Sequence, residues 1–314
     1  MAPLRHGGKT MKVKVPASTS NIGPGFDTLG LALNRYLYLS VDGGIAHSSS
    51  MKISIEGNGK EHIATDETNL VYQGMAALAN YAGTSYIKSL NNIHLHITNE
   101  IPSCGGLGGS GAAIAGGIFL ANAFLHTKIS HEEMLNIAVS VEGHPDNVSA
   151  AMMGGLTVNC FDNERLRCRS IKLASKLSVV TCSPNFQVLT KQARQILPKE
   201  VPLRDAVINI ENVASLIAAF VEGDVEALRY VTGDRLHEQY RAALIPGFAD
   251  VKKAALSAGA LSFNISGSGP TVFSFATSHE KQIGEAMVNA FSPHGVSSTY
   301  EIMTIENEGA RIIE

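Results

Sequence analysis

The segment at residues 101–117 restricts the fold more than any other part of the chain. It reads IPSCGGLGGSGAAIAGG, with seven glycines in seventeen residues, and it leads directly into an apolar helix. Glycines let a loop bring its backbone N–H groups close to an anion, and a helix N-terminus adds the positive end of its dipole. The segment therefore predicts a phosphate-binding loop at the start of a buried helix.

Other interpretations of this segment compete with the phosphate loop. Gly106, Gly108 and Gly111 match the dinucleotide pattern GxGxxG, but that pattern should directly follow a strand, and residues 99–105 intervene here. A Walker A loop is excluded, because no Gly-Lys-Ser or Gly-Lys-Thr follows the glycines. For the segment taken alone, the remaining alternative is a flexible turn before a tightly packed helix.

The composition favours a globular protein that acts on a small molecule. At 314 residues with 45% hydrophobic side chains, the chain exceeds the usual size of one compact domain, so two domains are expected. Twenty-five Lys and Arg against 28 Asp and Glu give a net charge of -3, which leaves no basic excess for nucleic acid or an anionic membrane. We therefore expect neither nucleic acid nor membrane as a partner.

Cysteine spacing and hydrophobic stretches favour a cytoplasmic location. The four cysteines show no CxxC spacing, so neither a disulfide framework nor a zinc knuckle is expected. The longest apolar stretch, residues 112–125, is too short to cross a bilayer. Residues 1–10 lack the apolar core of a signal peptide and are interpreted as an extension outside the fold.

Hydrophobic periodicity predicts an α+β protein without a strict βαβ alternation. Strands are expected at 12–16, 36–42, 51–56, 93–98, 154–161, 177–182, 261–265, 271–276 and 297–305. Helices are expected at 69–82, 110–125, 130–142, 203–221, 225–231, 249–258 and 280–291. A charged stretch near 163–170 is the expected boundary, which gives an N-terminal domain at 11–165 and a C-terminal domain at 166–314.

Three further segments accompany the glycine-rich loop. Residues 16–27 read PASTSNIGPGFD, residues 142–147 read EGHPDN, and residues 265–271 read ISGSGPT. With the loop, they resemble the signature blocks of the GHMP kinases, and within that superfamily the chain most resembles the homoserine kinases. The resemblance runs from Met11 to the C-terminus. In one departure, Gly109 stands where the family loop, usually GLGSS, has its first serine, which puts a phosphate contact from that side chain in doubt.

The resemblance implies a GHMP kinase fold, with a ribosomal-S5-like N-terminal domain, a ferredoxin-like C-terminal domain and ATP bound between them. It implies ATP-dependent phosphorylation of L-homoserine, a step of threonine biosynthesis. The implied ATP-binding residues are Asn69, Pro102, Ser103, Gly105, Gly106, Leu107, Gly108, Gly109, Ser110, Gly111 and Ala112. As an isolated asparagine, Asn69 would be read as a helix cap.

The resemblance also implies a metal site. Magnesium-bound ATP needs a hard oxygen ligand beside its phosphates, and Glu142 with the Ser110 hydroxyl would supply it. Both residues are therefore expected to be catalytic and to bind Mg²⁺. Taken alone, Glu142 would be read as a solvated helix terminus.

The implied substrate site matches the chemistry of homoserine. An ammonium group, a carboxylate and the reacting hydroxyl require an anion, planar cations and a polar side chain. The expected contacts are Asn21 and Asp27 to the ammonium group, Arg194 and Arg241 to the carboxylate, and Asn147 to the hydroxyl with Thr190 nearby.

The proton acceptor is left open by the sequence. Other GHMP kinases carry an aspartate as general base, whereas the homoserine kinase pattern has an asparagine there, here Asn147. Positioning and charge neutralisation would then supply most of the acceleration. Asp146 is the alternative base, whereas His144 is expected to be a local hydrogen-bonding residue.

A pair of histidines outside these blocks also stands out. His94 and His96 alternate on one face of an expected strand and could form part of a metal site. Because no third ligand is apparent in the sequence, an exposed strand face is the favoured interpretation.

Two other functions remain as alternatives. A GHMP kinase for another small alcohol, such as mevalonate or shikimate, would lack the set formed by Asp27, Arg194 and Arg241. A non-catalytic ligand sensor would have no need of Glu142, Ser110 and the glycine-rich loop. The sequence leaves the oligomeric state open, with a homodimer as one alternative.

Overall fold

The computed structural model describes residues 11–43, 51–91, 93–103, 105–173 and 177–313. The strands are β1 (Lys12–Ser20), β2 (Leu29–Gly43), β3 (Lys52–Gly57), β4 (Ile93–Asn99), β5 (Leu156–Asp162), β6 (Arg165–Ile171), β7 (Ser178–Pro184), β8 (Asn264–Ile265), β9 (Val272–Ala276), β10 (Ser298–Thr304) and β11 (Arg311–Ile312). The helices are α1 (Leu70–Ala82), α2 (Thr84–Ile87), α3 (Gly109–Phe124), α4 (His131–Glu142), α5 (Asp146–Met153), α6 (Thr190–Gln195), α7 (Leu203–Glu222), α8 (Leu228–Val231), α9 (Glu238–Arg241), α10 (Phe248–Ser257) and α11 (Glu280–Phe291).

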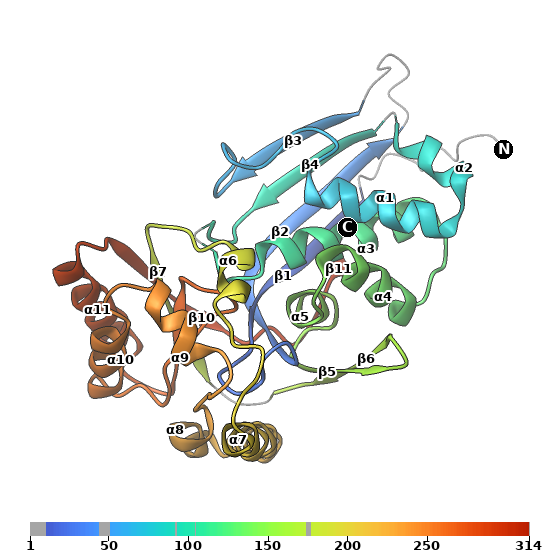
Figure 1. Cartoon of the computed structure of the whole chain (residues 1–314). Helices are drawn as coiled ribbons and strands as arrows, with labels where there is room; N and C mark the ends of the chain where they lie inside the picture. The colour runs from blue at the N-terminus through green and yellow to red at the C-terminus, as the bar shows by residue number, and fades with distance from the viewer. Residues whose placement is uncertain (1–10, 44–50, 92, 104, 174–176, 314) are drawn as a thin grey trace.

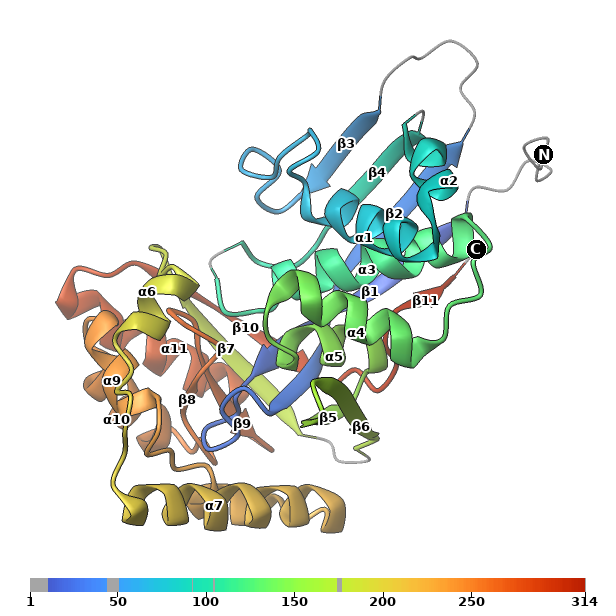
Figure 2. The same cartoon turned by 45° about the vertical axis from the view of Figure 1, so that its right-hand side comes forward.

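Within these residues the strands form two sheets. The larger has seven strands in the order β11-β1-β2-β4-β3, with the β5–β6 hairpin attached to β2, and α1, α3, α4 and α5 gather on one side of it (Figure 1). The smaller has four strands in the order β10-β7-β9-β8 (Figure 2). Its strands are all antiparallel, and the chain passes from β7 through helices α6–α10 to β8 and β9, and then through α11 to β10. With the helices between β7 and β8 counted as one layer, this is the order of a ferredoxin-like domain.

Strand β1 extends beyond Pro16, where the sequence predicted its end. The register between β1 and β2 shifts between Pro16 and Ala17. Such a bulge tolerates proline, which has no N–H group to donate to the ladder. The strand therefore continues to Ser20 and carries a run of buried polar residues toward the glycine-rich loop.

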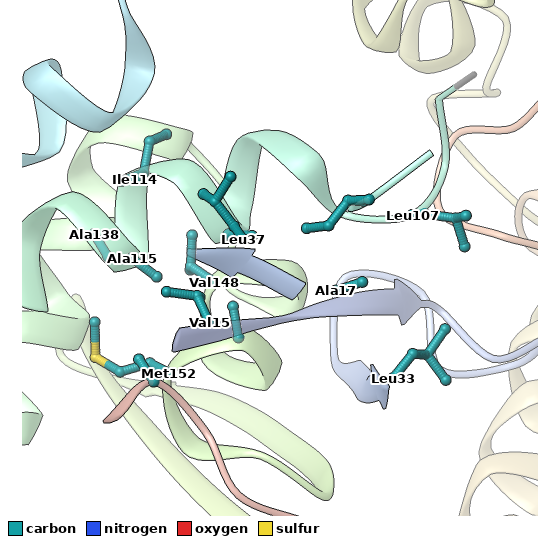
Figure 3. Close-up of a cluster of buried hydrophobic side chains, with 14 of the residues drawn as sticks. Val15, Ala17, Leu33, Leu37, Leu107, Ile114, Ala115, Ala138, Val148 and Met152 are labelled. Atoms are coloured by element: carbon teal, nitrogen blue, oxygen red, sulfur yellow. The ribbon is translucent and has the colours of Figure 1, made fainter. Parts of the chain in front are cut away.

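The glycine-rich loop ends in α3, which is fixed by the main core. Figure 3 shows Ile114 and Ala115 of α3 close to Val15, Leu37 and Val148, all nearly inaccessible to solvent. Each fully buried aliphatic side chain of this size stabilises the fold by roughly 1.5–3 kcal/mol. The start of α3 is thus attached to a rigid element.

Glycines bring α1 and α3 unusually close together. A Cβ atom at Gly117 would lie 2.0 Å from the carbonyl oxygen of Val71, and one at Gly74 would lie 2.5 Å from that of Ile114. Any larger residue would push the two helices apart. This close contact completes the helical layer over the larger sheet.

The expected domain boundary needs correction. Strand β6 begins at Arg165 and pairs with β5, so a division between residues 165 and 166 cuts through a hairpin of the larger sheet. The chain enters the smaller sheet at Ser178, and β11 then returns to pair with β1. The charged residues that suggested a boundary here, Arg165, Arg167 and Arg169, lie on the exposed face of β6.

The remaining sequence predictions concern short elements, cysteines and membrane-spanning helices. Helices α2, α5, α6 and α9 and strands β6 and β11 were not predicted. Helix α4 begins with a capping box formed by Ser130 and Glu133. Cys160, Cys168 and Cys182 are free thiols, and Cys104 and residues 1–10 lie outside the described residues. In the part of the chain that the structure describes, no helix is both long and apolar enough to span a membrane.

Candidate active site

A cavity of about 270 Å³ lies where the glycine-rich loop and the end of β1 meet α6 and the turn after β8. Figures 1 and 2 both show α6 beside the segment that leads from β4 into α3. All the predicted substrate residues line this cavity: Asn21, Asp27, Asn147, Thr190, Arg194 and Arg241. The rest of its wall is Ser20, Pro102, Ser103, Gly105, Gly106, Leu107, Gly108, Gly109, Ser110, His144, Asp146, Val188, Gly267, Ser268 and Gly269.

The second domain holds the glycine-rich loop in place. The Thr271 hydroxyl donates to the carbonyl oxygen of Gly105 at 2.5 Å, and the Ser266 hydroxyl donates to that of Gly106. On the other side, the backbone N–H of Ser18 donates to the carbonyl oxygen of Leu107 at 3.2 Å. Three successive carbonyl groups are thus bonded to the protein, which fixes the loop conformation.

The loop needs glycine for conformational reasons. Gly105 and Gly106 have φ angles of 86° and 91°, and Gly108, the N-cap of α3, has a φ of 66° with no side-chain cap. The first N–H groups of a helix have no intrahelical acceptor. With the helix dipole, they make the start of α3 a site for an anion such as phosphate.

Asn147 lies directly beneath this loop. Its Oδ1 accepts a hydrogen bond from the Ser18 hydroxyl at 2.9 Å, and its Nδ2 donates to Ser20 Oγ at 3.1 Å. A Cβ atom at Gly108 would lie 2.8 Å from Asn147 Oδ1, and one at Gly111 would lie 2.9 Å from Asn147 Cβ. These contacts fix the amide of Asn147 at the cavity wall.

Asp27 and Arg194 form a two-pronged ion pair across the cavity. Both guanidinium nitrogens, Nη1 and Nη2, donate to the carboxylate at 2.9 Å. Asp27 is oriented by Asn21, whose Oδ1 accepts from the Asp27 backbone N–H at 3.0 Å. The pair is only half-buried, with the two side chains 35% and 38% exposed, so a ligand can reach both partners.

Arg241 is buried and links α9 to α6. Its Nη1 donates to the Gly267 carbonyl oxygen at 2.9 Å and its Nε to that of Ala193 at 3.2 Å. Ala193 is the residue before Arg194, so this contact also positions α6. His237 Nε2 donates to the carbonyl oxygen of Gly23, which leaves Nδ1 to accept from Arg241 at 3.3 Å. Burial lowers the pKa of Arg241, and Asp27 opposes that shift.

A chain of polar and ionisable side chains extends from Ser110 to Asp146. The Ser110 hydroxyl donates to Glu142 Oε1 at 2.6 Å, and His144 lies with Nε2 3.8 Å from that same oxygen and Nδ1 2.9 Å from Asp146 Oδ1. Burial raises the pKa of Glu142, and the Ser110 bond only partly offsets it. Glu142 is therefore a nearly buried carboxylate, with its side chain 7% exposed, that a cation would stabilise.

The pKa shifts of His144 and Asp146 oppose the effect of burial. Burial alone would lower the pKa of His144, but its hydrogen bond and charge interaction with Asp146 raise it. Burial would raise the pKa of Asp146, but the bonds from His144 and from the Asn147 N–H lower it. The two side chains thus stabilise each other's charged forms, and His144 makes the local hydrogen bond expected of it.

A second cavity of about 380 Å³ adjoins the first. The two share Pro102, Ser103, Gly109 and Ser110, and the second is lined mostly by apolar residues of β2, β4, α1 and the segment before α1. Asn69 lies on its wall and also caps α1, with Oδ1 accepting from the Val71 N–H at 2.9 Å. Asn69 therefore caps α1 and also lines the second cavity.

Some predicted residues lie outside the cavity walls. Gly111 and Ala112 are buried in the first turn of α3 and line neither cavity. Glu142 lies behind Ser110 and lines an open hollow beside α6. Gly109 faces open space, since a Cβ atom there would meet nothing within 4 Å.

The sequence did not indicate several residues that support the site. Ser18 and Ser20 hold Asn147, Ser266 and Thr271 hold the loop, and Phe26 packs under both arginines. Glu238 is fully buried, accepts from the Ile265 N–H at 2.7 Å, and has its pKa raised by burial to about 8. All of these residues except Glu238 lie in the blocks at 16–27 and 265–271, which is the signal that the sequence gave.

Known proteins are similar to this chain in sequence. Residues 69–155 match the GHMP kinase N-terminal domain, and residues 216–293 match the GHMP kinase C-terminal domain. A homoserine kinase of Moorella thermoacetica is 41% identical over 301 residues, covering 96% of this chain and 99% of its own. A homoserine kinase of Halothermothrix orenii is 41% identical over 301 residues, covering 95% and 94%. The chain belongs to the homoserine kinase family.

Solved structures confirm the predicted α+β GHMP kinase fold. The crystal structure of a homoserine kinase from Cytophaga hutchinsonii matches with a TM-score of 0.83 at 30% identity, covering 99% of both chains. A mevalonate kinase from L. major matches with a TM-score of 0.67 at 14% identity over 97% of both chains, which shows a shared fold alone. As a member of the family, the protein is an ATP-dependent kinase.

Proposed function

We propose that the protein phosphorylates L-homoserine with ATP, and the Asp27–Arg194 pair carries this proposal. A free amino acid has an ammonium group and a carboxylate one carbon apart, and the pair presents the complementary charges side by side. When homoserine binds, two ion pairs replace the Asp27–Arg194 pair: Asp27 meets the ammonium group and Arg194 meets the carboxylate. Arg241 is a second cation for the carboxylate. An alcohol without the ammonium group would leave Asp27 unmatched.

The reacting hydroxyl of homoserine would then lie toward Asn147 and the glycine-rich loop. Asn147, Asp27, Arg194 and Arg241 line one cavity, so a short substrate can contact all four. Thr190, at the start of α6, is a further polar group on the same wall.

ATP would occupy both cavities. The apolar cavity beside Asn69 suits adenine, and the glycine-rich loop with the start of α3 suits the phosphates. Because the two cavities share Pro102, Ser103, Gly109 and Ser110, one extended ligand can pass from one to the other.

Glu142 and the Ser110 hydroxyl fit a magnesium ion. They are adjacent hard oxygen donors, and burial already destabilises the Glu142 carboxylate in the absence of a cation. When bound, Mg²⁺ would neutralise charge on the ATP phosphates. The N–H groups at the start of α3 supply the rest of the positive field around the transferred group.

The arrangement favours transfer without a strong base. Asn147 is neutral and hydrogen-bonded, so it can orient the hydroxyl but cannot take its proton. Asp146 has a lowered pKa and is already bonded to His144, which makes it a weak proton acceptor at neutral pH. In a loose transition state the proton can leave late, to a phosphate oxygen or to water.

We also propose a pathway, a cellular location and an oligomeric state for the enzyme. Formation of O-phosphohomoserine would be a step of threonine biosynthesis, and we propose a cytoplasmic location for the enzyme. A homodimer is the oligomeric state we propose for testing by light scattering.

A substrate panel tests the proposed activity. ADP release by the purified protein should be fast with homoserine and near background with mevalonate, shikimate and galactose, because these alcohols lack the amino-acid group that Asp27 and the arginines recognise. A coupled ADP assay measures this directly. Release with none of the alcohols would instead favour a non-catalytic ligand sensor.

The carboxylate contact can be tested with Arg194→Ala. Loss of a charged hydrogen bond of roughly 1.5–3 kcal/mol should raise the KM for homoserine about ten- to a hundredfold. The KM for ATP should change little. Lys191→Ala removes an exposed cation from the same helix and is the matched control.

Arg241→Ala should weaken homoserine use as well, but it also removes bonds to Gly267 and Ala193, so its folding must be checked. If both arginine variants kept the parent KM for homoserine and lost ATP affinity, the carboxylate would bind elsewhere.

If the reaction needs no strong base, substitutions at Asp146 and Glu142 should lower kcat to different extents. Asp146→Asn should lower kcat by less than the roughly hundredfold expected for loss of a general base. Glu142→Gln should lower kcat far more, because it weakens the proposed magnesium site. Turnover at saturating homoserine and Mg²⁺, with folding checked by circular dichroism, gives the comparison. Equal loss in both variants would identify Asp146 as the base.

A further inference from the structure

Three side chains on the outer face of the larger sheet form a cluster that catalysis does not use. Asp42 lies near the end of β2, and His94 and His96 lie on β4. In the antiparallel β2–β4 ladder Asp42 pairs with His94, and Ser40 pairs with His96. The three side chains therefore project from one face, opposite the residues that enter the core.

The cluster is compact. One potential ligand atom from each of Asp42, His94 and His96 lies within 4.8 Å of the others. His96 Nε2 is 3.1 Å from Asp42 Oδ2, and the two imidazole rings lie with their centroids 3.8 Å apart. The sequence near the two histidines shows no third ligand, but Asp42 on the neighbouring strand β2 supplies one.

The donor set is selective for one class of metal. Two imidazoles and one carboxylate suit Zn²⁺ and similar divalent transition ions, whereas Mg²⁺ and Ca²⁺ prefer oxygen ligands alone. The proposed magnesium ligands, Glu142 and Ser110, both offer oxygen. The two sites would therefore prefer different ions.

The local surroundings prepare the imidazoles for binding. Ser54 Oγ lies 2.7 Å from His94 Nε2 and holds that ring in place. His96 and Asp42 remain 39% and 46% exposed, so an ion can enter from solvent.

We propose that Asp42, His94 and His96 bind a divalent transition-metal ion of the Zn²⁺ class, with water completing its coordination. The ion replaces the His96–Asp42 hydrogen bond with bonds to both side chains. It links β2 to β4, and it binds the folded chain in preference to the unfolded one. The ion therefore stabilises the fold without entering the reaction.

Titration of the metal-free protein with ZnCl₂, without ATP, tests this site. Isothermal calorimetry should show one Zn²⁺ bound through the cluster, and His96→Ala and His94→Ala should each lose that binding event. At a free Zn²⁺ concentration about a hundred times the Kd, the melting temperature of the parent should rise by a few degrees. The histidine variants should show no such rise.

Matched variants separate the cluster from other metal contacts. Asp42→Asn keeps the size of the side chain and should weaken Zn²⁺ binding at least about tenfold, whereas Ser40→Ala, on the same face of β2, should bind as the parent does. His131→Ala removes a histidine from α4 and should also bind normally. Parent-like Zn²⁺ stoichiometry and affinity in folded His94→Ala and His96→Ala would overturn the proposal.

Discussion

Hydrogen bonds from the second domain to the carbonyl oxygens of the glycine-rich loop hold the active site together. Thr271 and Ser266 follow β8 in the smaller sheet, yet their hydroxyls bond to Gly105 and Gly106 of the larger domain. The loop is thereby ordered before a nucleotide arrives, which lowers the entropy cost of binding one. Because the same turn presents the Gly267 carbonyl to Arg241, the phosphate site and the substrate site depend on one interface between the domains.

The charges of the site are arranged before the substrate binds. Arg194 is held by Asp27, and Asp146 is held by His144, so these four side chains form two pairs in the absence of ligand. A buried charge without a partner would be costly. The Asp27–Arg194 pair is the more exposed of the two and is the one that a zwitterionic substrate can enter. The His144–Asp146 pair stays internal and fixes the start of α5, where Asn147 lies.

Short sequence blocks predicted residues that lie around one cavity, because each block encodes a local conformation. The glycines at 105, 106 and 108 have positive φ angles, and the blocks at 16–27, 142–147 and 265–271 all reach one cavity. Contacts between distant segments could not be read in the same way. The hydrogen bonds that Asn147 makes with Ser18 and Ser20 span 129 and 127 residues, and the carboxylate beside His94 comes from another strand. Helix α5 was missed because it is short and begins after a proline.

ATP affinity of a Ser266→Ala, Thr271→Val double variant tests most directly whether the second domain orders the phosphate loop. Calorimetry should show the Kd for ATP raised about tenfold or more, from two lost hydrogen bonds of about 1 kcal/mol each, in a protein that still folds. Ser274→Ala is the control, because that buried hydroxyl has no hydrogen-bond partner among the described residues. Parent-like ATP affinity in the folded double variant would contradict the account.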